Sequence, residues 1–248
     1  MTPLRYDRAV TLEDIPASAP EIEAIRGLRI ERSTTAERVA ASLRTLIIKG
    51  DLPPGSPLRE GALVQALGVS RNTLREAFRL LSRDRLVVHQ MHRGVDVKRL
   101  DESDVRDIYR TRLPLELAAI QRSAELPKEG LHPIREVVEQ AAEALEKKDW
   151  KQLATLDLIF HQRLVDLLDS RRISTFFETV LAELRLAFAI PRDQESFLGP
   201  FVPWNDKLCG LLENGRRQEC AQEIRIYLER AEELIQSFLR QAAEPSGE

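Results

Sequence analysis

The stretch "LREGALVQALGVSRNTLREAFRLLSRD", residues 58–84, decides the fold of the N-terminal part of the chain. Two helical patterns of apolar residues meet at "LGVS", where Gly68 can end the first helix and Ser70 can cap the second. Leu74 and Phe78 then recur at helical spacing, which predicts that one face of the second helix is buried. Two helices joined by so tight a turn are typical of a helix-turn-helix.

The residues on either side complete a recognisable order of elements. Another helix is expected to begin at Thr34 or Thr35 and to end at Gly50, because "DLPPG" cannot continue it. Its apolar stripe consists of Val39, Leu43, Leu46 and Ile47. After residue 84, "RLVVHQ" and "VDVKRL" are predicted to be two short strands joined across "MHRG". Three helices and a two-stranded wing predict a winged helix-turn-helix domain over residues 34–100.

The distribution of charge supports this division of the chain. Residues 34–100 contain twelve Lys/Arg and six Asp/Glu, a balance of +6. Residues 101–248 contain twenty and twenty-eight, a balance of −8, and the first 33 residues contribute −1, which gives the total of −3. A basic segment followed by an acidic one indicates a module that binds a polyanion, attached to a module that does not.

Side chains suited to reading DNA lie near the start of the predicted third helix. Arginine presents a fork that pairs with guanine, and asparagine suits adenine, while a helix N-terminus can contact phosphate. Such a helix on its own is more often a solvated face, but the element order, the turn and the charge together favour DNA binding. The residues expected to contact DNA here and at the wing tip are Arg71, Asn72, Thr73, Arg75, His92, Arg93 and Gly94.

The segment from "LRTLIIKGDLPPG" to "LSRDRLV" resembles the N-terminal domain of GntR-family transcription regulators, over about residues 35–99. Two positions depart from the family pattern. Gly61 stands where many members carry a charged residue, so one DNA contact is in doubt, and Arg59 is a candidate to replace it. Arg85 stands where the family usually has glycine before "LV".

From residue 101 onward the pattern is helical, with segments expected at about 102–125, 133–147, 150–169, 172–190, 203–213 and 217–241. Pro114 is expected to kink the first of these or to split it. The fold class is therefore mainly α: a winged helix-turn-helix domain and, over 101–241, an antiparallel bundle of six or seven helices. Residues 1–33 are expected to be a flexible arm and residues 242–248 a disordered tail.

Five polar side chains interrupt apolar faces on four of these helices: Arg112, Asp157, His161, Asn205 and Tyr227. A buried charge is costly unless it is paired, so these groups should meet one another or a ligand. The histidine and the tyrosine taken singly are explained as ordinary core residues. A guanidinium cannot neutralise itself, so Arg112 needs an anion. Asp157 in a structural pair and the carboxylate of an effector are the two alternatives.

"DVRDIYRTRLPLELAA" and "LATLDLIFHQRLVDLL" resemble the helical FCD-type domain of the FadR subfamily, over about residues 101–240. The resemblance implies a cavity that binds and senses a small effector, commonly a carboxylate, and in many members a metal held by one Asp and three His. Asp157 and His161 match the first two ligand positions, but Asn205 and Tyr227 occupy the others. We therefore expect no metal and no other cofactor; a divalent ion, if bound at all, would be weakly held, with Asp157 and His161 its only plausible ligands.

Several classes of protein are disfavoured by the sequence. No apolar run approaches the roughly 18 residues of a membrane span, and no signal peptide is recognisable, so a cytoplasmic protein is expected. Cys209 and Cys220 are too few for a disulfide framework. Paired Glu-x-x-His motifs, catalytic triads and phosphate-binding loops are absent, which argues against an enzyme and makes a helical-bundle metalloenzyme a distant alternative.

The sequence thus predicts a homodimeric transcription regulator, in most cases of this kind a repressor, that binds a palindromic operator in double-stranded DNA. Its DNA binding would respond to a small organic acid held by the five polar residues of the bundle. The alternative is a regulator with a vestigial metal site and no effector, acting constitutively or through a protein partner.

Overall fold

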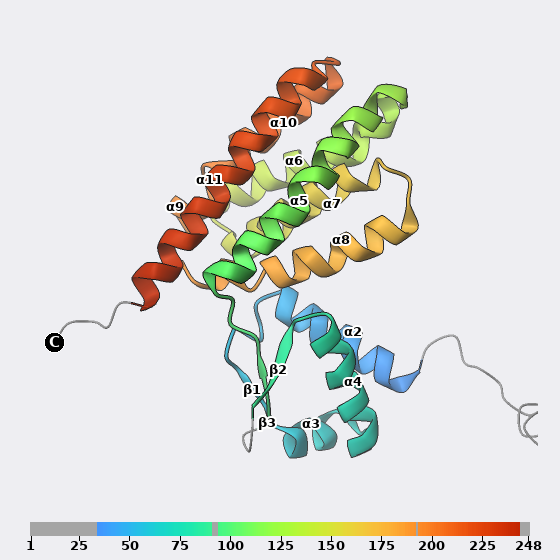
Figure 1. Cartoon of the computed structure of the whole chain (residues 1–248), viewed down its shortest axis with the longest axis vertical. Coiled ribbons are helices and arrows are strands. Elements are labelled where there is room, and N and C mark those ends of the chain that lie inside the picture. The colour runs from blue at the N-terminus through green and yellow to red at the C-terminus, as the bar shows by residue number, and fades with distance from the viewer. Residues whose placement is uncertain (1–33, 91–93, 192, 244–248) are drawn as a thin grey trace, which may run out of the picture. The chain divides into compact units, whose positions relative to one another are not determined.

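The computed structural model describes residues 34–90, 94–191 and 193–243 (Figure 1). In its N-terminal part three helices lie beside a small sheet, whose strands follow the order β1-β3-β2 with antiparallel pairing. Val87 pairs with Val97 and Gln90 with Gly94. The elements are α2 (Thr35–Ile48), β1 (Pro57–Leu58), α3 (Glu60–Leu67), α4 (Arg71–Arg83), β2 (Val87–Gln90) and β3 (Gly94–Val97). This is the predicted winged helix-turn-helix.

The turn between α3 and α4 forms as its residues predict. Gly68 adopts a left-handed conformation with φ of 63°, which closes α3 at a position where a Cβ would be strained. The hydroxyl of Ser70 accepts a hydrogen bond from the backbone N–H of Thr73 and so caps α4. Leu74 and Phe78 are buried, so α4 is anchored by one face while the opposite face remains in solvent.

Some expectations for this domain were wrong or fall outside the described residues. Leu46, expected on the buried stripe of α2, is 39% exposed, whereas Val39, Leu43 and Ile47 are buried. The two-residue strand β1 was not predicted. The wing-tip residues His92 and Arg93 and the arm at residues 1–33 lie outside the described part of the chain.

The C-terminal part is built from helices alone. Its elements are α5 (Glu102–Arg122), α6 (His132–Glu146), α7 (Trp150–Asp166), α8 (Arg171–Leu184), α9 (Gln194–Leu198), α10 (Phe201–Glu213) and α11 (Arg217–Ala243), with short 3₁₀ turns at Ser123–Glu125, Lys128–Leu131 and Ala187–Ala189. Helix α5 packs along α11, and α6 along α7 (Figure 1). None of the described helices is both long and apolar enough to cross a membrane.

Three details differ from the expected helices. Helix α5 is not split at Pro114 but runs continuously through it. The segment expected as one helix over 172–190 ends at Leu184, and the additional helix α9 follows after a 3₁₀ turn. Helix α11 extends to Ala243, so residues 242 and 243, expected in the tail, are helical, while residues 244–248 lie outside the described part.

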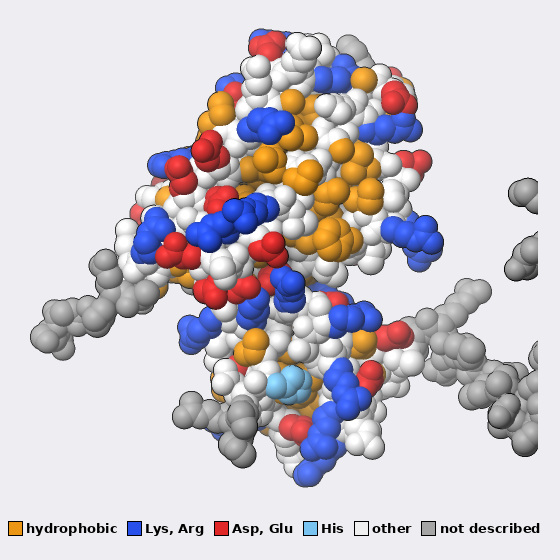
Figure 2. All heavy atoms as spheres, viewed as in Figure 1, with side chains coloured by type: hydrophobic (Ala, Val, Ile, Leu, Met, Phe, Trp, Pro, Cys, Tyr) orange, Lys and Arg blue, Asp and Glu red, His pale blue; other side chains and the backbone are white. Residues whose placement is uncertain are grey.

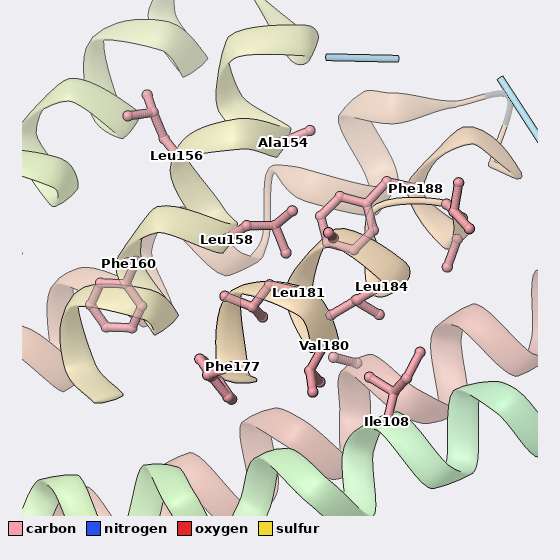
Figure 3. Packing of buried hydrophobic residues seen from close by; sticks show 14 of the residues in the cluster. Ile108, Ala154, Leu156, Leu158, Phe160, Phe177, Val180, Leu181, Leu184 and Phe188 are labelled. Carbon is pink, nitrogen blue, oxygen red and sulfur yellow. The ribbon is translucent and has the colours of Figure 1, made fainter. Parts of the chain in front are cut away.

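Helix α8 shows how the core is assembled. Phe177, Val180, Leu181 and Leu184 project from it between its neighbours, toward Ile108 of α5 and Leu158 of α7 (Figure 3). Their spacing of three and four residues places them on one face, and all of them are buried. Burial of each large side chain stabilises the fold by about 1.5–3 kcal/mol, so this face fixes α8 against α5 and α7.

Candidate DNA interface and effector site

The start of α4 presents polar side chains that are free to bind a partner. Arg71 and Asn72 are exposed, and their side chains make no hydrogen bond or ion pair with any other described residue. Arg75 is also exposed, although its Nε lies 3.1 Å from Oε2 of Glu60. Thr73 shares a hydrogen bond of 2.8 Å with Ser70. Because the N-terminal end of a helix carries partial positive charge, this end of α4 suits a polyanion.

Basic side chains run along this part of the surface (Figure 2). Arg59, the candidate replacement for a contact at Gly61, is exposed at the N-cap of α3. Gly94 opens β3 with φ of 100°, a conformation that glycine adopts readily. The structure therefore places the described residues of the predicted DNA-contact set at the surface of one domain.

The interior of the helical part contains a chain of hydrogen-bonded polar groups. Arg112 on α5 is 2% exposed, and its Nε donates to Oε1 of Glu116, one turn later, over 2.9 Å. The other oxygen of Glu116 lies 2.7 Å from Nδ1 of His161 on α7. Nε2 of His161 lies 3.2 Å from the hydroxyl of Tyr227 on α11. The carboxylate that meets Arg112 is thus Glu116, not Asp157.

Asp157 holds the other end of this network. Its Oδ1 accepts a hydrogen bond of 2.9 Å from the hydroxyl of Tyr227 and one of 3.0 Å from Nδ2 of Asn205 on α10. The five polar residues singled out in the sequence therefore lie in one connected network, joined through Glu116. Four helices contribute to it, so the network ties α5, α7, α10 and α11 together.

The donors and acceptors of the network can be counted. Because a carboxylate only accepts, Nδ1 of His161 donates to Glu116. The hydroxyl proton of Tyr227 is used on Asp157, so the oxygen of Tyr227 accepts from Nε2 of His161. Glu116 therefore lies between the guanidinium of Arg112 and the ring of His161, and Tyr227 lies between His161 and Asp157, so neither buried carboxylate is left without a partner.

The surroundings of these groups alter their protonation. Burial works to raise the pKa of Glu116, but the charges of Arg112 and His161 and their hydrogen bonds hold it below the ordinary value. Burial disfavours the charged guanidinium of Arg112, yet Glu116 keeps the pKa of Arg112 above its ordinary value. Burial and the nearby Asp157 raise the pKa of Tyr227 well above its usual range, so the phenol remains a donor.

A small cavity opens beside the network. Arg112, Asp157 and Tyr227 line it, together with Tyr109, whose ring centroid lies 4.9 Å from the guanidinium carbon of Arg112. The rest of the lining is apolar: Phe188, Phe197, Leu198, Phe201, Ala231 and Ile235. Its volume of about 10 Å³ leaves room for about one water molecule. His161 and Asn205 do not line the cavity, but they form hydrogen bonds with Tyr227 and Asp157, which do.

Three polar atoms of this region are buried without a partner among the described residues: the terminal NH2 nitrogen of Arg112, Oδ1 of Asn205 and Nε1 of Trp204. Trp204, next to Asn205 on α10, contributes to an aromatic cluster around the cavity. Its ring centroid lies 5.2 Å from that of Tyr227 and 6.1 Å from that of Phe201. An unpaired buried nitrogen on a guanidinium is costly, so Arg112 retains an unmet need for an acceptor.

The same residues do not suit the metal that many FCD domains hold. Both nitrogens of His161 are engaged in hydrogen bonds, and neutral oxygens of Asn205 and Tyr227 replace the two other imidazoles. Within the described ranges, no group of three or more His, Cys, Asp or Glu side chains is arranged to hold a metal ion.

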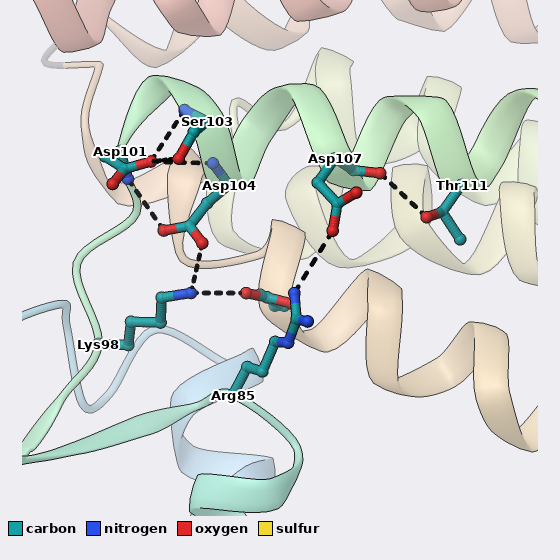
Figure 4. Close-up of polar contacts among 8 residues, drawn as sticks. Arg85, Lys98, Asp101, Ser103, Asp104, Asp107 and Thr111 are labelled. Carbon is teal, nitrogen blue, oxygen red and sulfur yellow. Dashed lines mark hydrogen bonds and ion pairs between the residues drawn. The ribbon is translucent and has the colours of Figure 1, made fainter.

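A second polar cluster joins the winged domain to the helical part (Figure 4). Nζ of Lys98, just after β3, lies 2.7 Å from Asp104 of α5 and 2.9 Å from Glu183 of α8. Burial raises the pKa of Glu183, an effect that Lys98 offsets only in part. Arg85 reaches Asp107 of α5 over 3.5 Å, with both side chains largely exposed. Helix α5 therefore contacts the winged domain at one end and carries Arg112 and Glu116 further along.

Arg85 also explains the family's preference at its position. Its φ is 58°, in the left-handed region that favours glycine. The arginine accepts this backbone strain and gains the ion pair with Asp107. The departure from the family pattern thus adds a contact between the two parts of the chain.

Sequence reasoning missed Glu116, Lys98 and Glu183. A signal for Glu116 was present, because it follows Arg112 by four residues and so shares its helix face. Pro114, which lies between them, predicts a break in the helix instead. No local signal marks Lys98 or Glu183, since their contact joins residues 85 positions apart.

Comparison with known proteins agrees with this architecture. Residues 35–97 match the bacterial regulatory proteins of the gntR family, and residues 107–230 match the FCD domain. The crystal structure of a transcriptional regulator GntR from Rhodococcus sp. RHA1 is 34% identical, with a TM-score of 0.77, and the match covers 86% of this chain and 100% of that one. The chain belongs to the GntR family.

Two curated relatives are similar over part of their length. An HTH-type transcriptional regulator of Bacillus subtilis (strain 168), YdhC, is 31% identical over 56% of this chain and 62% of its own. The gluconate operon transcriptional repressor of Bacillus licheniformis is 28% identical over 55% of this chain and 56% of its own. The chain thus spans less than two thirds of these relatives.

Proposed function

We propose that this GntR-family protein is a transcription repressor that binds operator DNA through α4 and responds to a small effector in its helical domain. The observation that carries the proposal is the free N-terminal end of α4, where Arg71 and Asn72 are exposed and unpartnered. In a winged helix-turn-helix this end enters the major groove, where such side chains can reach base edges. The gluconate operon relative is named a repressor, which supports the direction of control.

The protein would act on a palindromic operator as a homodimer in the cytoplasm, and it would not be an enzyme. A large apolar area on the surface supports dimerisation: Figure 2 shows it over α5 and α8. Phe176 of α8 is 51% exposed, and Leu113 and Leu117 of α5 are only partly buried. An exposed patch of this kind is commonly a contact with another protein surface. A second copy of the chain would cover it and place two copies of α4 on one DNA.

Helix α5 offers a route by which an effector could change DNA binding. Its first turns hold the winged domain through Asp104 and Asp107, and Arg112 and Glu116 follow one to three turns later. A ligand that binds to Arg112 would shift this helix, and the shift would change the contacts of Lys98 and Arg85. The effector then changes the relative population of DNA-competent arrangements, provided it binds one arrangement more tightly.

A mobility-shift assay with the DNA upstream of the protein's own gene tests the proposal. The substitutions Arg71→Ala and Asn72→Ala should each weaken binding by about 1–3 kcal/mol, roughly 5- to 150-fold. Arg171→Ala is a matched control, because Arg171 is also an exposed first residue of a helix, α8, yet lies in the helical domain. Unchanged DNA binding by the Arg71 and Asn72 variants would contradict the proposal.

A second candidate is a regulator that needs no effector. The small volume of the cavity, about 10 Å³, favours it, because no organic acid fits there without movement. Such a protein would bind DNA in the same way but would not be stabilised by any small acid. The ligand experiments described next separate the two candidates.

A further inference from the structure

We infer that the cavity beside Arg112 binds a small 2-amino or 2-hydroxy carboxylic acid with an apolar side chain. The inference rests on the proposed effector response and names the chemical class that this cavity selects. It follows from three features of the lining: an incompletely paired guanidinium, a carboxylate with a free oxygen, and walls that are otherwise aromatic or aliphatic.

The guanidinium defines where the carboxylate of the ligand binds. Nε of Arg112 is used by Glu116, but its NH2 nitrogen is buried without a partner. Arg112 lines the cavity and is held over the ring of Tyr109, so its position is fixed before any ligand arrives. A carboxylate oxygen at NH2 would supply the missing acceptor in a charge-assisted hydrogen bond.

Asp157 defines a second polar contact close to the first. Its Oδ1 accepts from Tyr227 and Asn205, whereas its Oδ2 makes no hydrogen bond to another described residue. A bare carboxylate would be repelled by this second negative charge. A ligand with a hydroxyl or ammonium group next to its carboxylate would instead donate to Asp157. A zwitterion would satisfy both contacts and add no net charge to the interior.

The remaining walls determine the side chain of the ligand. Five of the chain's thirteen aromatic residues line this one cavity, and the other non-polar positions are aliphatic. Sugar acids carry several hydroxyl groups, which would lose water here without finding partners. A phenyl or branched alkyl group would contact Phe188, Phe197 and Ile235 and bury apolar surface instead.

Helix α9 must move to admit such a ligand. It is five residues long and covers the cavity with Phe197 and Leu198. The ring of Phe197 contacts Phe188 and Phe238 edge to face, at 5.3 and 5.9 Å between centroids. A ring on the ligand would take the place of Phe197 in these contacts. The displacement of Phe197 would open the cavity while leaving the polar network in place.

Thermal shift and calorimetric titration of the full chain test the inference. L-phenylalanine and phenyllactate should bind and raise the melting temperature. 3-Phenylpropionate lacks the donor, phenethylamine lacks the carboxylate, and D-gluconate lacks the apolar group, so each should bind at least 10-fold more weakly. A preference for phenylalanine over phenyllactate assigns the ammonium form, and the opposite preference assigns the hydroxyl form. Either preference supports the inference.

Variants locate the binding site. Arg112→Lys keeps the charge opposite Glu116 but loses the fork, and Asp157→Asn keeps acceptors for Tyr227 but loses the negative charge. Each should weaken the tighter ligand at least 10-fold. Arg135→Lys is the control, since Arg135 is also an ion-paired arginine, partly buried, but does not line the cavity. Leu198→Trp, at the helix that covers the cavity, should also reduce affinity without touching the network.

The inference is overturned if none of the acids binds, if D-gluconate binds as tightly as phenyllactate, or if Arg112→Lys and Arg135→Lys weaken binding equally. DNA binding measured without ligand keeps this result separate from the proposed repressor function. If DNA binding depends on Arg71 while no acid binds, the effector-free regulator is the correct account. If DNA binding fails as well, the proposed function itself is wrong.

Discussion

Two arginines, each on a helix, show how differently the two domains use the same side chain. Arg71 of α4 lies in solvent without a partner, whereas Arg112 of α5 is 2% exposed and bonded to Glu116. An exposed guanidinium costs little to leave unpaired and stays available for a large polyanion. A buried guanidinium requires a partner that is already in place, and an N–H group left unpaired is suited to bind a small ligand. The two arginines therefore differ in exposure and in pairing, although the side chain is the same.

Lys98 stands between these extremes, at the contact of the two domains. Its side chain is 15% exposed and has two carboxylate partners, one on α5 and one on α8. A cation that is partly buried and doubly paired contributes more than a surface ion pair but is not part of a sealed interior. Arg71, Lys98 and Arg112 thus form a series from unpaired and exposed to fully buried. Substitutions at more buried positions should change the free energy of unfolding more.

The largest effect is expected at the enclosed end. Glu116→Ala leaves Arg112 and His161 buried without their shared carboxylate and should lower the free energy of unfolding by about 3–5 kcal/mol. Denaturant titration measures this change. Glu139→Ala, an exposed glutamate of α6, is the control and should stay within about 0.5 kcal/mol of the wild type. Equal effects of the two substitutions would show that the carboxylate of Glu116 does not stabilise the fold by pairing with Arg112 and His161.

An intermediate effect is expected for Lys98→Met, which removes the partner of Asp104 and of the 7% exposed Glu183. The free energy of unfolding should fall by about 1–2 kcal/mol at neutral pH, since one carboxylate is left poorly paired. Burial works to lower the pKa of Lys98, but its two carboxylates raise it above 10.5. The stabilisation by Lys98 is therefore complete below pH 10.5 and is lost as the pH rises through the folded-state value.

Denaturation profiles at neutral and alkaline pH check this expectation. Lys147→Met is the control, because Lys147 makes only an exposed pair with Glu143. A gap between Lys98→Met and the wild type that persists unchanged well above the folded-state pKa would show that the ammonium charge is not what matters at this position.

The smallest effect is expected at the surface, where Arg85→Gly should stabilise the protein. The left-handed backbone costs an arginine about 1 kcal/mol more than a glycine, while the exposed pair with Asp107 is worth less than that. We expect a gain of about 0.5 kcal/mol, measured as a rise in the melting temperature. Arg83→Gly, two residues earlier in the last turn of α4, should instead lose about 1 kcal/mol. A loss in both variants would show that Asp107 outweighs the backbone strain.

The sequence was sufficient where local rules govern the structure. The cap at Ser70, the left-handed Gly68 and the buried Leu74 each depend on neighbours within a few residues, and each was predicted. The burial of Arg112 and of His161 was predicted in the same way, from helical spacing. Their hydrogen-bond partners were not predicted, because these depend on how four helices pack and on which carboxylate lies nearest to each side chain.

The errors have physical causes of the same kind. Leu46 was placed on the buried stripe by spacing alone, but the width of the stripe is set by the elements that cover α2. Pro114 was expected to kink α5 or to split it, and the split is wrong: the helix runs on through the proline although one backbone hydrogen bond is lost there. The strand β1 exists only because β3 offers it a partner, so no pattern within Pro57–Leu58 could reveal it.

The position of Trp204 gives the protein a built-in optical reporter. The chain has two tryptophans, and only Trp204 lies among the aromatic rings around the cavity, in contact with Tyr227. Indole emission depends on the polarity and the motion of its surroundings, so the light from Trp204 would change when the wall beside it is rearranged. Trp150, at the start of α7, supplies a background from a different part of the fold. Occupation of the cavity could thus be followed in real time by fluorescence, without attaching a dye to the molecule.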